Sequence, residues 1–245
     1  MKQNRPRNMP KSAMVLAAGL GLRMRPLTES RPKPLVSVAG QPLIEHIFKP
    51  IEAAGVSRIV MNVHYLADQL RAHIAARAGA DVIISDETAR LMDSGGGIKK
   101  ALSALAHEPF FVLNGDSFWI DGPRPNLMRL AEAWEPERMD ILLLVVASAL
   151  ATGYEGKGDF TMEADGRLHR RVERHVAPFV YAGVGIMKPE LFSDTPEGPF
   201  SLNLLFDRAI SAEKLFGLRL DGEWLHVGTP NAIEAAEMRL RRSTL

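Results

Sequence analysis

Short apolar runs of the β type alternate with helical patterns through about the first 150 residues, and this alternation limits the fold more than any other feature. It is typical of parallel strands joined by crossover helices. The predicted strands are Ala13–Leu16, Ile59–Val63, Val82–Ser85, Phe110–Asn114 and Ile141–Ala147, and the predicted helices are Leu43–Ala54, Leu66–Ala76, Ile98–Leu105 and Leu127–Trp134. The pattern therefore predicts an α/β fold, a doubly wound Rossmann-like sheet with helices on both faces.

Beyond residue 150 the pattern loosens into short runs between glycines, which indicates mixed or antiparallel strands. Residues 153–158 contain three glycines and are predicted to form a flexible loop. Near the end, Thr229 as N-cap and Pro230 at the first helical position predict a final helix. No linker or repeat divides the chain, so we expect a single domain over residues 12–245 with a mixed sheet.

The charges are balanced overall but uneven along the chain. With 30 basic and 29 acidic residues, the net charge of +1 provides no field that would attract nucleic acid. Residues 1–11 contain no acidic residue and four cations, namely Lys2, Arg5, Arg7 and Lys11. We expect residues 1–11 to form a solvated basic tail.

The sequence contains no cysteine, which excludes disulfides, thiolate metal sites and a cysteine nucleophile and is typical of a reducing compartment. The longest aliphatic runs, residues 13–20 and 141–147, are much shorter than the roughly 20 residues that cross a bilayer. We therefore expect a cytoplasmic protein, a monomer or small homo-oligomer, with neither nucleic-acid nor membrane partners.

A glycine-rich and basic segment follows the first predicted strand, at the sheet edge where open α/β sheets bind ligands. Gly19 and Gly21 allow the main chain to approach a ligand and direct amide N–H groups at phosphate oxygens, and Arg23 and Lys33 add positive charge. The segment lacks the Gly-Lys-Ser/Thr of a Walker A loop and the third glycine of the dinucleotide fingerprint. It indicates a phosphate site, and turn glycines beside surface cations are the alternative.

Asp116 is the second candidate group, because it follows the strand Phe110–Asn114 at the same predicted sheet edge. Mg²⁺ binds a few carboxylate oxygens together with phosphate oxygens and water. Asp116 is therefore a candidate metal ligand, and an aspartate that caps a loop is the alternative.

Three consecutive glycines, Gly95–Gly97, precede the predicted helix Ile98–Leu105, and Asp93 or Ser94 is the expected N-cap. Such a run loses much chain entropy on folding, which suggests that a flat ligand such as a nucleobase or ribose passes close to the main chain. A cap before a flexible turn is the alternative.

The spacing Gly19-Leu-Gly-Leu-Arg-Met-Arg-Pro-Leu-Thr28, followed by Lys33-Pro-Leu35 and Gly40-Gln-Pro-Leu43, resembles the signature of the sugar-1-phosphate nucleotidylyltransferases. The resemblance implies the nucleotide-diphospho-sugar transferase type of fold, with Arg23, Lys33 and Asp116 as catalytic residues and Mg²⁺ held by Asp116. It implies a nucleoside triphosphate and a sugar 1-phosphate as partners. The implied nucleotide-binding residues are Leu16, Ala17, Ala18, Gly19, Gly21, Arg23, Lys33, Asp93, Gly95, Gly96 and Asn114.

His226 is the chief departure from that family, whose late Trp-x-Asp-x-Gly-Thr segment here begins at Trp224 with histidine in place of aspartate. Imidazole is a poor ligand for Mg²⁺ and a better one for Mn²⁺ or Co²⁺. Three functional interpretations stay open: His226 binds a softer metal, it contacts the phosphates, or one Mg²⁺ suffices. A histidine that only forms hydrogen bonds at a strand end is the structural alternative.

The triple glycine, Gly156-Lys-Gly-Asp-Phe160 and Tyr181-Ala-Gly-Val184 are similar to the N-acetylmuramate-1-phosphate uridylyltransferases of peptidoglycan recycling. That branch implies UTP as donor and N-acetylmuramic acid 1-phosphate as acceptor. Asp159, Gly183 and Asn203 are the implied sugar-binding residues. The cation that holds the acceptor phosphate stays open among Lys157, Arg170 and Arg171. The alternatives are a mannose-1-phosphate guanylyltransferase and a non-catalytic nucleotide-sugar sensor or regulatory subunit.

Overall fold

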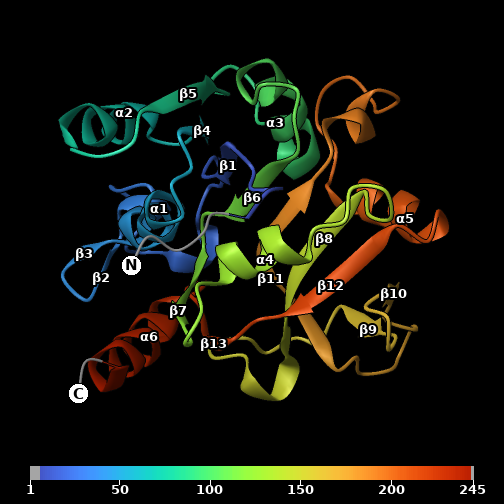
Figure 1. Ribbon diagram of the computed structural model, residues 1–245. Helices are drawn as coiled ribbons and strands as arrows, with labels where there is room; N and C mark the ends of the chain where they lie inside the picture. The colour runs from blue at the N-terminus through green and yellow to red at the C-terminus, as the bar shows by residue number, and fades with distance from the viewer. Residues whose placement is uncertain (1–5, 244–245) are drawn as a thin grey trace.

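The computed structural model describes residues 6–243 and is built around a nine-stranded mixed sheet (Figure 1). Seven strands follow one another across it: β10 (Leu168–Arg170), β9 (Phe160–Met162), β11 (Phe179–Met187), β6 (Phe110–Asn114), β1 (Ser12–Leu16), β4 (Arg58–Val63) and β5 (Val82–Asp86). The other two are β8 (Ile141–Ala147), which pairs with β11, and β12 (Leu215–Arg219), which pairs with β8.

Helices cover both faces of this sheet, as the alternating pattern predicts. One face packs against α1 (Leu43–Ala53), α2 (Ala67–Ala76) and α4 (Asn126–Ala133), and the other against α3 (Asp93–Ala101) and α5 (Asn203–Ser211). Strand β1 serves both cores, because Ala13 and Val15 point into the first and Met14 into the second. The doubly wound α/β prediction is confirmed.

The connections create a switch point beside β1. Strand β1 pairs in parallel with β4 on one side and with β6 on the other. The chain runs from β1 to β4 and β5, then crosses back to β6. The loops that follow β1 and β6 therefore diverge, and a crevice opens between them at the carboxyl ends of the strands.

The second half of the chain extends the sheet with mixed pairing, as predicted. Strand β11 is antiparallel to β6, β8 and β9, whereas β12 is parallel to β8. The predicted strand Ile141–Ala147 is β8, and its first six residues are buried. Strands on both sides and helices on both faces explain why this run is uniformly apolar.

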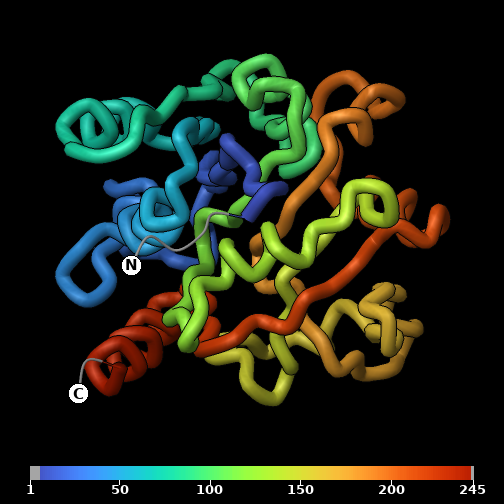
Figure 2. The backbone as a smooth tube through the Cα atoms, in the orientation of Figure 1, coloured from blue at the N-terminus to red at the C-terminus, as the bar shows by residue number. Residues whose placement is uncertain are grey.

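Two small strand pairs lie outside the main sheet, one between distant parts of the chain and one a local hairpin. Strand β7 (Ser117–Asp121) pairs with β13 (Gly222–His226), and β2 (Ser37–Val38) pairs with β3 (Gln41–Pro42). The last helix, α6 (Pro230–Ser243), begins at the predicted proline and runs beside β2, where Glu237 accepts a hydrogen bond from the Ala39 amide at 2.8 Å (Figure 2). Its apolar stripe of Ile233, Ala236 and Leu240 packs against the first core.

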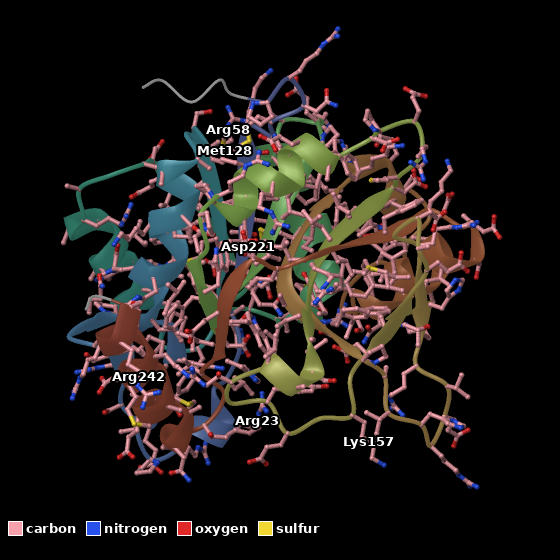
Figure 3. The ribbon with its side chains drawn as sticks, turned by 60° about the horizontal axis from the view of Figure 1, so that its bottom comes forward. Arg23, Arg58, Met128, Lys157, Asp221 and Arg242 are labelled. Carbon is pink, nitrogen blue, oxygen red and sulfur yellow. The ribbon has the colours of Figure 1, made fainter. Side chains whose placement is uncertain are left out.

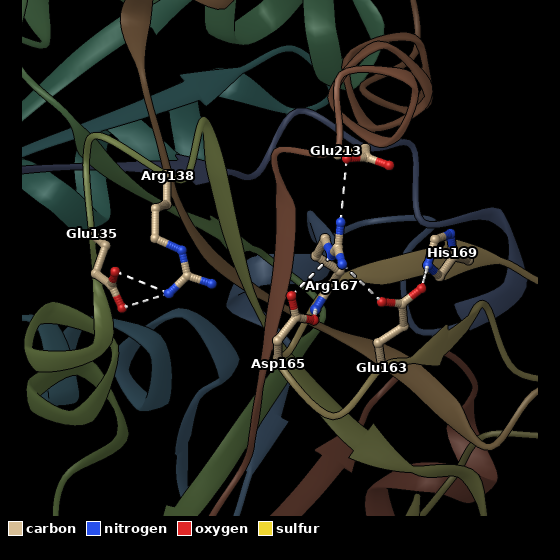
Figure 4. Close-up of polar contacts among 7 residues, drawn as sticks. All are labelled: Glu135, Arg138, Glu163, Asp165, Arg167, His169 and Glu213. Carbon is tan, nitrogen blue, oxygen red and sulfur yellow. Dashed lines mark hydrogen bonds and ion pairs between the residues drawn. The ribbon is translucent and has the colours of Figure 1, made fainter.

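The hairpin β9–β10, at one edge of the sheet, is linked through Arg167 to the segment before β12 (Figure 4). Its guanidinium forms ion pairs with Glu163 at 3.2 Å, Asp165 at 2.9 Å and Glu213 at 3.3 Å. Glu163 also contacts His169 at 2.7 Å. Because these groups lie at the surface, we treat the cluster as an orienting contact of modest energy.

Several predicted boundaries need correction. Helix α3 begins at Asp93 and follows Met92, so the prediction of Asp93 or Ser94 as N-cap is wrong, and the three glycines lie inside the helix. The basic tail is also wrong in part: residues 1–5 lie outside the described residues, but Met9 and Pro10 are buried against the domain. Gly55, with φ of 71°, follows α1 as expected of a helix C-terminus.

The glycines of α3 make room for the chain itself. A Cβ atom on Gly95 would lie 2.4 Å from the Phe200 ring, and one on Gly96 would lie 2.4 Å from the Gly198 carbonyl oxygen. The amides of both glycines donate to the Phe200 carbonyl. The interpretation that a flat ligand explains these glycines is therefore wrong, because the segment 198–200 supplies the close approach.

Within residues 6–243 there is no helix of the length and apolar character needed to cross a membrane.

The packing of α3 predicts the effect of one added methyl group. We expect Gly96→Ala to lower the free energy of unfolding by about 1–3 kcal/mol, because its Cβ would collide with the Gly198 main chain. Gly19→Ala is the matched control, since nothing lies within 4 Å of a Cβ there, and should change stability by less than about 0.5 kcal/mol. Denaturant unfolding of both variants measures this, and equal stabilities would contradict the packing.

Candidate active site

A cavity of about 560 Å³ lies at the switch point between β1 and β6. The loops after β1, β5 and β6, the end of β4 and the start of α3 form most of its walls. The lining residues are Leu16, Ala17, Ala18, Gly19, Leu20, Gly21, Leu22, Arg23, Met24, Lys33, Pro34, Asn62, Glu87, Leu91, Asp93, Ser94, Asn114, Gly115, Asp116 and Gly228. Of the predicted nucleotide-binding residues, Gly95 and Gly96 are absent from these walls.

The glycine loop is held in shape by its own neighbours. Gly21 has φ of 65°, and a Cβ there would meet Thr28 at 3.0 Å, so glycine is required by the loop itself. The Thr28 hydroxyl donates to the Gly21 carbonyl at 2.8 Å, and the Tyr65 hydroxyl donates to the Thr28 carbonyl at 3.0 Å. At Gly19, by contrast, the space beside Cα is open to the cavity. A ligand is therefore free to approach the main chain at Gly19.

Arg23 and Lys33 follow this loop on two short 3₁₀ helices, η1 (Leu22–Met24) and η2 (Lys33–Leu35). The Lys33 side chain is only 12% exposed, and its Nζ lies 3.1 Å from Asp116 Oδ2. Asp116 follows β6 through Gly115, whose amide donates to the Leu16 carbonyl at 2.9 Å. The parallel pairing of β1 with β6 thus brings the predicted catalytic cation and carboxylate into contact.

The charges of this group are mutually dependent. Burial alone raises the pKa of Asp116, but the charge of Lys33, then those of His226 and Arg23, more than offset it and bring that pKa below its ordinary value. Burial lowers the pKa of Lys33, and Asp116 opposes this only in part. Asp116 is therefore ionised at neutral pH and faces a cation from which water is largely excluded.

His226 ends β13 and lies beside the same carboxylate. Its Nε2 is 3.7 Å from Asp116 Oδ2, and its ring stacks on Trp224 with centroids 5.6 Å apart. Burial lowers the pKa of His226, Asp116 opposes this, and Lys33 and Arg23 add to it. Its Nδ1 is buried with no hydrogen-bond partner among the described residues. The structure thus brings His226 and Asp116 together, while no cluster of three or more acidic, histidine or cysteine ligands occurs within residues 6–243.

The predicted sugar-binding residues lie outside the cavity walls. A Cβ on Gly183 would lie 2.6 Å from Ser117 Oγ, so this glycine makes room for β7 and not for a sugar at its side-chain position. Asp159 accepts a hydrogen bond from the Tyr181 amide at 2.9 Å. Asn203, at the start of α5, accepts one from Arg170 at 3.0 Å. Each of the three therefore has a role in the fold, and a role in sugar binding stays a prediction.

The three candidate cations for the acceptor phosphate differ in the contacts that their side chains make within the fold. Arg170 is bound to Asp207 at 2.6 Å and lies over the Phe160 ring, so it is held by structural contacts. Arg171 donates to the His175 carbonyl at 3.1 Å. Lys157 lies in the predicted flexible loop, which has no helix or strand, and in Figure 3 it and Arg23 both lie along the lower edge of the molecule.

Two buried polar residues of the wall were not predicted. Asn62 lies near the end of β4, and Glu87 directly follows β5. Asn62 Oδ1 accepts the Ala17 amide at 2.7 Å, so this amide of the loop is not free for a phosphate. Both residues stand at carboxyl ends of predicted strands, and the rule that placed Asp116 could have found them.

An open α/β sheet with a glycine loop, a buried lysine and a carboxylate at its switch point is an arrangement suited to binding phosphate groups. The model of the MobA-like NTP transferase domain matches residues 13–180. The chain belongs to this family and is a nucleotidyltransferase.

Similarity to known proteins extends over nearly the whole chain. The chain is 46% identical to an N-acetylmuramate alpha-1-phosphate uridylyltransferase of Caulobacter vibrioides, covering 94% of this chain and 97% of that protein. A Neisseria meningitidis protein of the same name is 32% identical over 92% of this chain and 96% of its own length. A probable mannose-1-phosphate guanylyltransferase of Arabidopsis thaliana is 31% identical over 89% of this chain but only 62% of its own length. The resemblance to the sugar-1-phosphate nucleotidylyltransferases is confirmed.

The fold is also found in a UDP-glucose pyrophosphorylase solved with UDP-glucose, at a TM-score of 0.78 and 15% identity. The match covers 95% of this chain and 99% of that chain. This likeness shows the fold and confirms the nucleotide-diphospho-sugar transferase type of architecture.

The charge pattern of the site predicts how stability responds to acid. Because the pKa of Asp116 is lower in the folded chain, its ionised form stabilises the fold above the unfolded pKa of about 4, and this contribution is lost as pH falls through the folded pKa. We expect the free energy of unfolding to fall less between about pH 5 and pH 3 in Asp116→Asn than in the wild type.

Urea unfolding at a series of pH values measures this difference. Asp86, whose pKa hydrogen bonds from Thr88 lower to about 2, is present in both proteins and should leave a shared acid dependence. Parallel curves for the two proteins would contradict a depressed pKa at Asp116.

Proposed function

We propose that this enzyme transfers the uridylyl group of UTP to N-acetylmuramic acid 1-phosphate and releases pyrophosphate and UDP-N-acetylmuramic acid. The single observation that supports nucleotidyl transfer is the 3.1 Å contact of Lys33 with Asp116 in a cavity bordered by the glycine loop. The two uridylyltransferase relatives, which match nearly the whole chain, support the choice of nucleotide and sugar.

The proposed reaction joins two anions. An oxygen of the sugar phosphate forms a bond to the α-phosphorus of UTP, and the bond from that phosphorus to the oxygen bridging to the β-phosphate breaks. Lys33, held by Asp116, and the exposed Arg23 both line the cavity, where their positive charge would offset the repulsion and stabilise the transition state. The attacking phosphate is already anionic, so no general base is needed.

The donors near Asp116 suit a divalent cation. One carboxylate beside a space for phosphate oxygens and water is the set of ligands that Mg²⁺ takes in many phosphoryl-transfer sites. His226 Nε2, 3.7 Å from the same carboxylate, adds a nitrogen donor that favours Mn²⁺ or Co²⁺. We infer that Asp116 and His226 would hold the metal, which when bound would neutralise charge on the reacting phosphates.

The proposal is tested with a panel of the four nucleoside triphosphates against several sugar 1-phosphates, followed as pyrophosphate release. We expect the highest kcat/KM for UTP with N-acetylmuramic acid 1-phosphate. GTP with mannose 1-phosphate is the second candidate pair, which the plant relative favours. Tight nucleotide binding without any pyrophosphate release would instead support the non-catalytic sensor.

Removing the Arg23 guanidinium should slow the chemical step. We expect Arg23→Ala to lose on the order of 2–4 kcal/mol of transition-state stabilisation, the range for one preorganised donor, measured as the fall in kcat/KM. Arg25→Ala is the matched control, because Arg25 lies in the same exposed loop but does not line the cavity, and it should retain activity. Near-normal turnover of Arg23→Ala would remove Arg23 from the mechanism.

Replacing His226 with a carboxylate should change the metal preference. We expect wild type to use Mn²⁺ or Co²⁺ well relative to Mg²⁺, and His226→Asp to shift toward Mg²⁺, because an oxygen donor replaces a nitrogen donor. Turnover with each metal and Mn²⁺ affinity by electron paramagnetic resonance measure the shift. The same metal preference in both proteins would exclude His226 as a ligand.

A further inference from the structure

A wholly buried carboxylate in the cavity wall has no part in the proposed reaction. Glu87 is 0% exposed, yet its oxygens are held by two neutral donors. Oε1 accepts a hydrogen bond from Asn62 Nδ2 at 2.7 Å, and Oε2 accepts one from the Met92 amide at 3.0 Å. A buried charge is less favourable than a neutral amide of the same shape, so the presence of a carboxylate here calls for a functional reason.

The carboxylate fixes the orientation of its neighbour. An ionised carboxylate only accepts hydrogen bonds, whereas an amide side chain both donates and accepts. Asn62 must therefore turn its Nδ2 toward Glu87, which leaves its Oδ1 to accept the Ala17 amide at 2.7 Å. A glutamine at position 87 would permit the opposite orientation of the Asn62 amide. The charge of Glu87 thus selects one of two arrangements.

This arrangement joins segments on two sides of the cavity. Ala17 begins the glycine loop after β1, and Met92 directly precedes α3, whose Asp93 and Ser94 line the opposite wall. Both main-chain amides are tied to the same pair of side chains. Glu87 and Asn62 therefore set how far apart the two walls stand.

The third glycine of α3 makes room for this pair. A Cβ on Gly97 would lie 2.7 Å from Glu87 Oε1 and 2.8 Å from Asn62 Nδ2. Gly97 is buried within α3, and its φ is not positive, so its backbone angles do not require glycine. The absence of a side chain at Gly97 therefore allows Glu87 and Asn62 to pack directly against the helix main chain.

We propose that Glu87 and Asn62 are positioning residues for the nucleotide, which hold the Ala17 and Met92 main chains at the separation that the bound nucleotide requires. The inference rests on the proposed function for the choice of UTP as the probe. Lys33 and Asp116 are held by separate contacts, through η2 and Gly115. A change in Glu87 or Asn62 should therefore affect nucleotide binding and leave the proposed catalytic pair in place.

A double-mutant cycle separates this role from a general loss of stability. In Glu87→Gln, every orientation of the two amides leaves two donors facing each other, at Met92, at Ala17 or between the two side chains. In Asn62→Asp, two carboxylates face each other. The double variant Asn62→Asp/Glu87→Gln moves the charge to position 62 and restores all three hydrogen bonds. The new carboxylate accepts from the Ala17 amide and from the new side-chain amide at position 87, whose oxygen in turn accepts from the Met92 amide.

The affinity for UTP is measured by titration calorimetry, and kcat and both KM values by pyrophosphate release. We expect each single variant to raise the Kd and KM for UTP by about tenfold or more, with kcat and the KM of the sugar phosphate changed less than about threefold. The double variant should recover the UTP affinity to within about threefold of wild type.

Asp121→Asn provides the matched control, because Asp121 accepts hydrogen bonds from Asn126 in a similar pair that does not line the cavity. It should lower the thermal midpoint without changing the Kd for UTP. Two results would overturn the proposal: single variants that bind UTP as wild type does, or a double variant that melts like wild type but binds UTP no better than the singles.

The test of the Glu87–Asn62 pair gives a result even if the proposed function is wrong. If the wild type binds UTP but transfers it to no sugar 1-phosphate, the proposed function fails, and the calorimetric cycle still decides the role of the pair. If the wild type binds another nucleoside triphosphate more tightly, the same cycle is measured with that nucleotide. If the single variants do not fold, the double variant alone decides, and weak UTP binding by a folded double variant overturns the proposal.

Discussion

The contact between Lys33 and Asp116 is the interaction on which the site depends. The two residues lie 83 positions apart in the chain. They meet because β1 and β6 are parallel neighbours at the point where the sheet changes its winding direction. The positive charge of Lys33 beside Asp116 lowers the pKa of this carboxyl group. Asp116 therefore stays ionised at neutral pH. The arrangement suits the handling of phosphate groups.

Much of the fold was predictable because its signals are local. The uniform apolar run Ile141–Ala147 predicts a strand, and β8 has those bounds. The prediction that a ligand explains the glycines of α3 is wrong for a physical reason. A missing Cβ shows that something approaches the main chain, but it does not distinguish a ligand from Phe200, which folding brings there from a distant part of the sequence. The same limit applies to Gly183 and Ser117.

The candidate site was predictable where residue types and spacing carried the chemistry, and the loop with Gly19, Arg23 and Lys33 lines the cavity as expected. Glu87 and Asn62 were missed because they belong to no contiguous pattern. Each is an ordinary polar residue at the end of a strand, and only the three-dimensional network shows that one orients the other. The buried Nδ1 of His226 likewise depends on β13, whose pairing with β7 connects residues far apart in sequence.

That pairing of β13 with β7 also has a consequence for biosynthesis. Strand β13 places His226 beside Asp116, and the Val227 amide donates to the Asp116 carbonyl at 2.9 Å. The ribosome completes the glycine loop, β6 and Asp116 long before it adds these residues. A nascent chain therefore holds Asp116 without its contacts to His226 and Val227 until β13 has been synthesised. The complete surroundings of this carboxylate therefore form only after residues 222–227 have been synthesised.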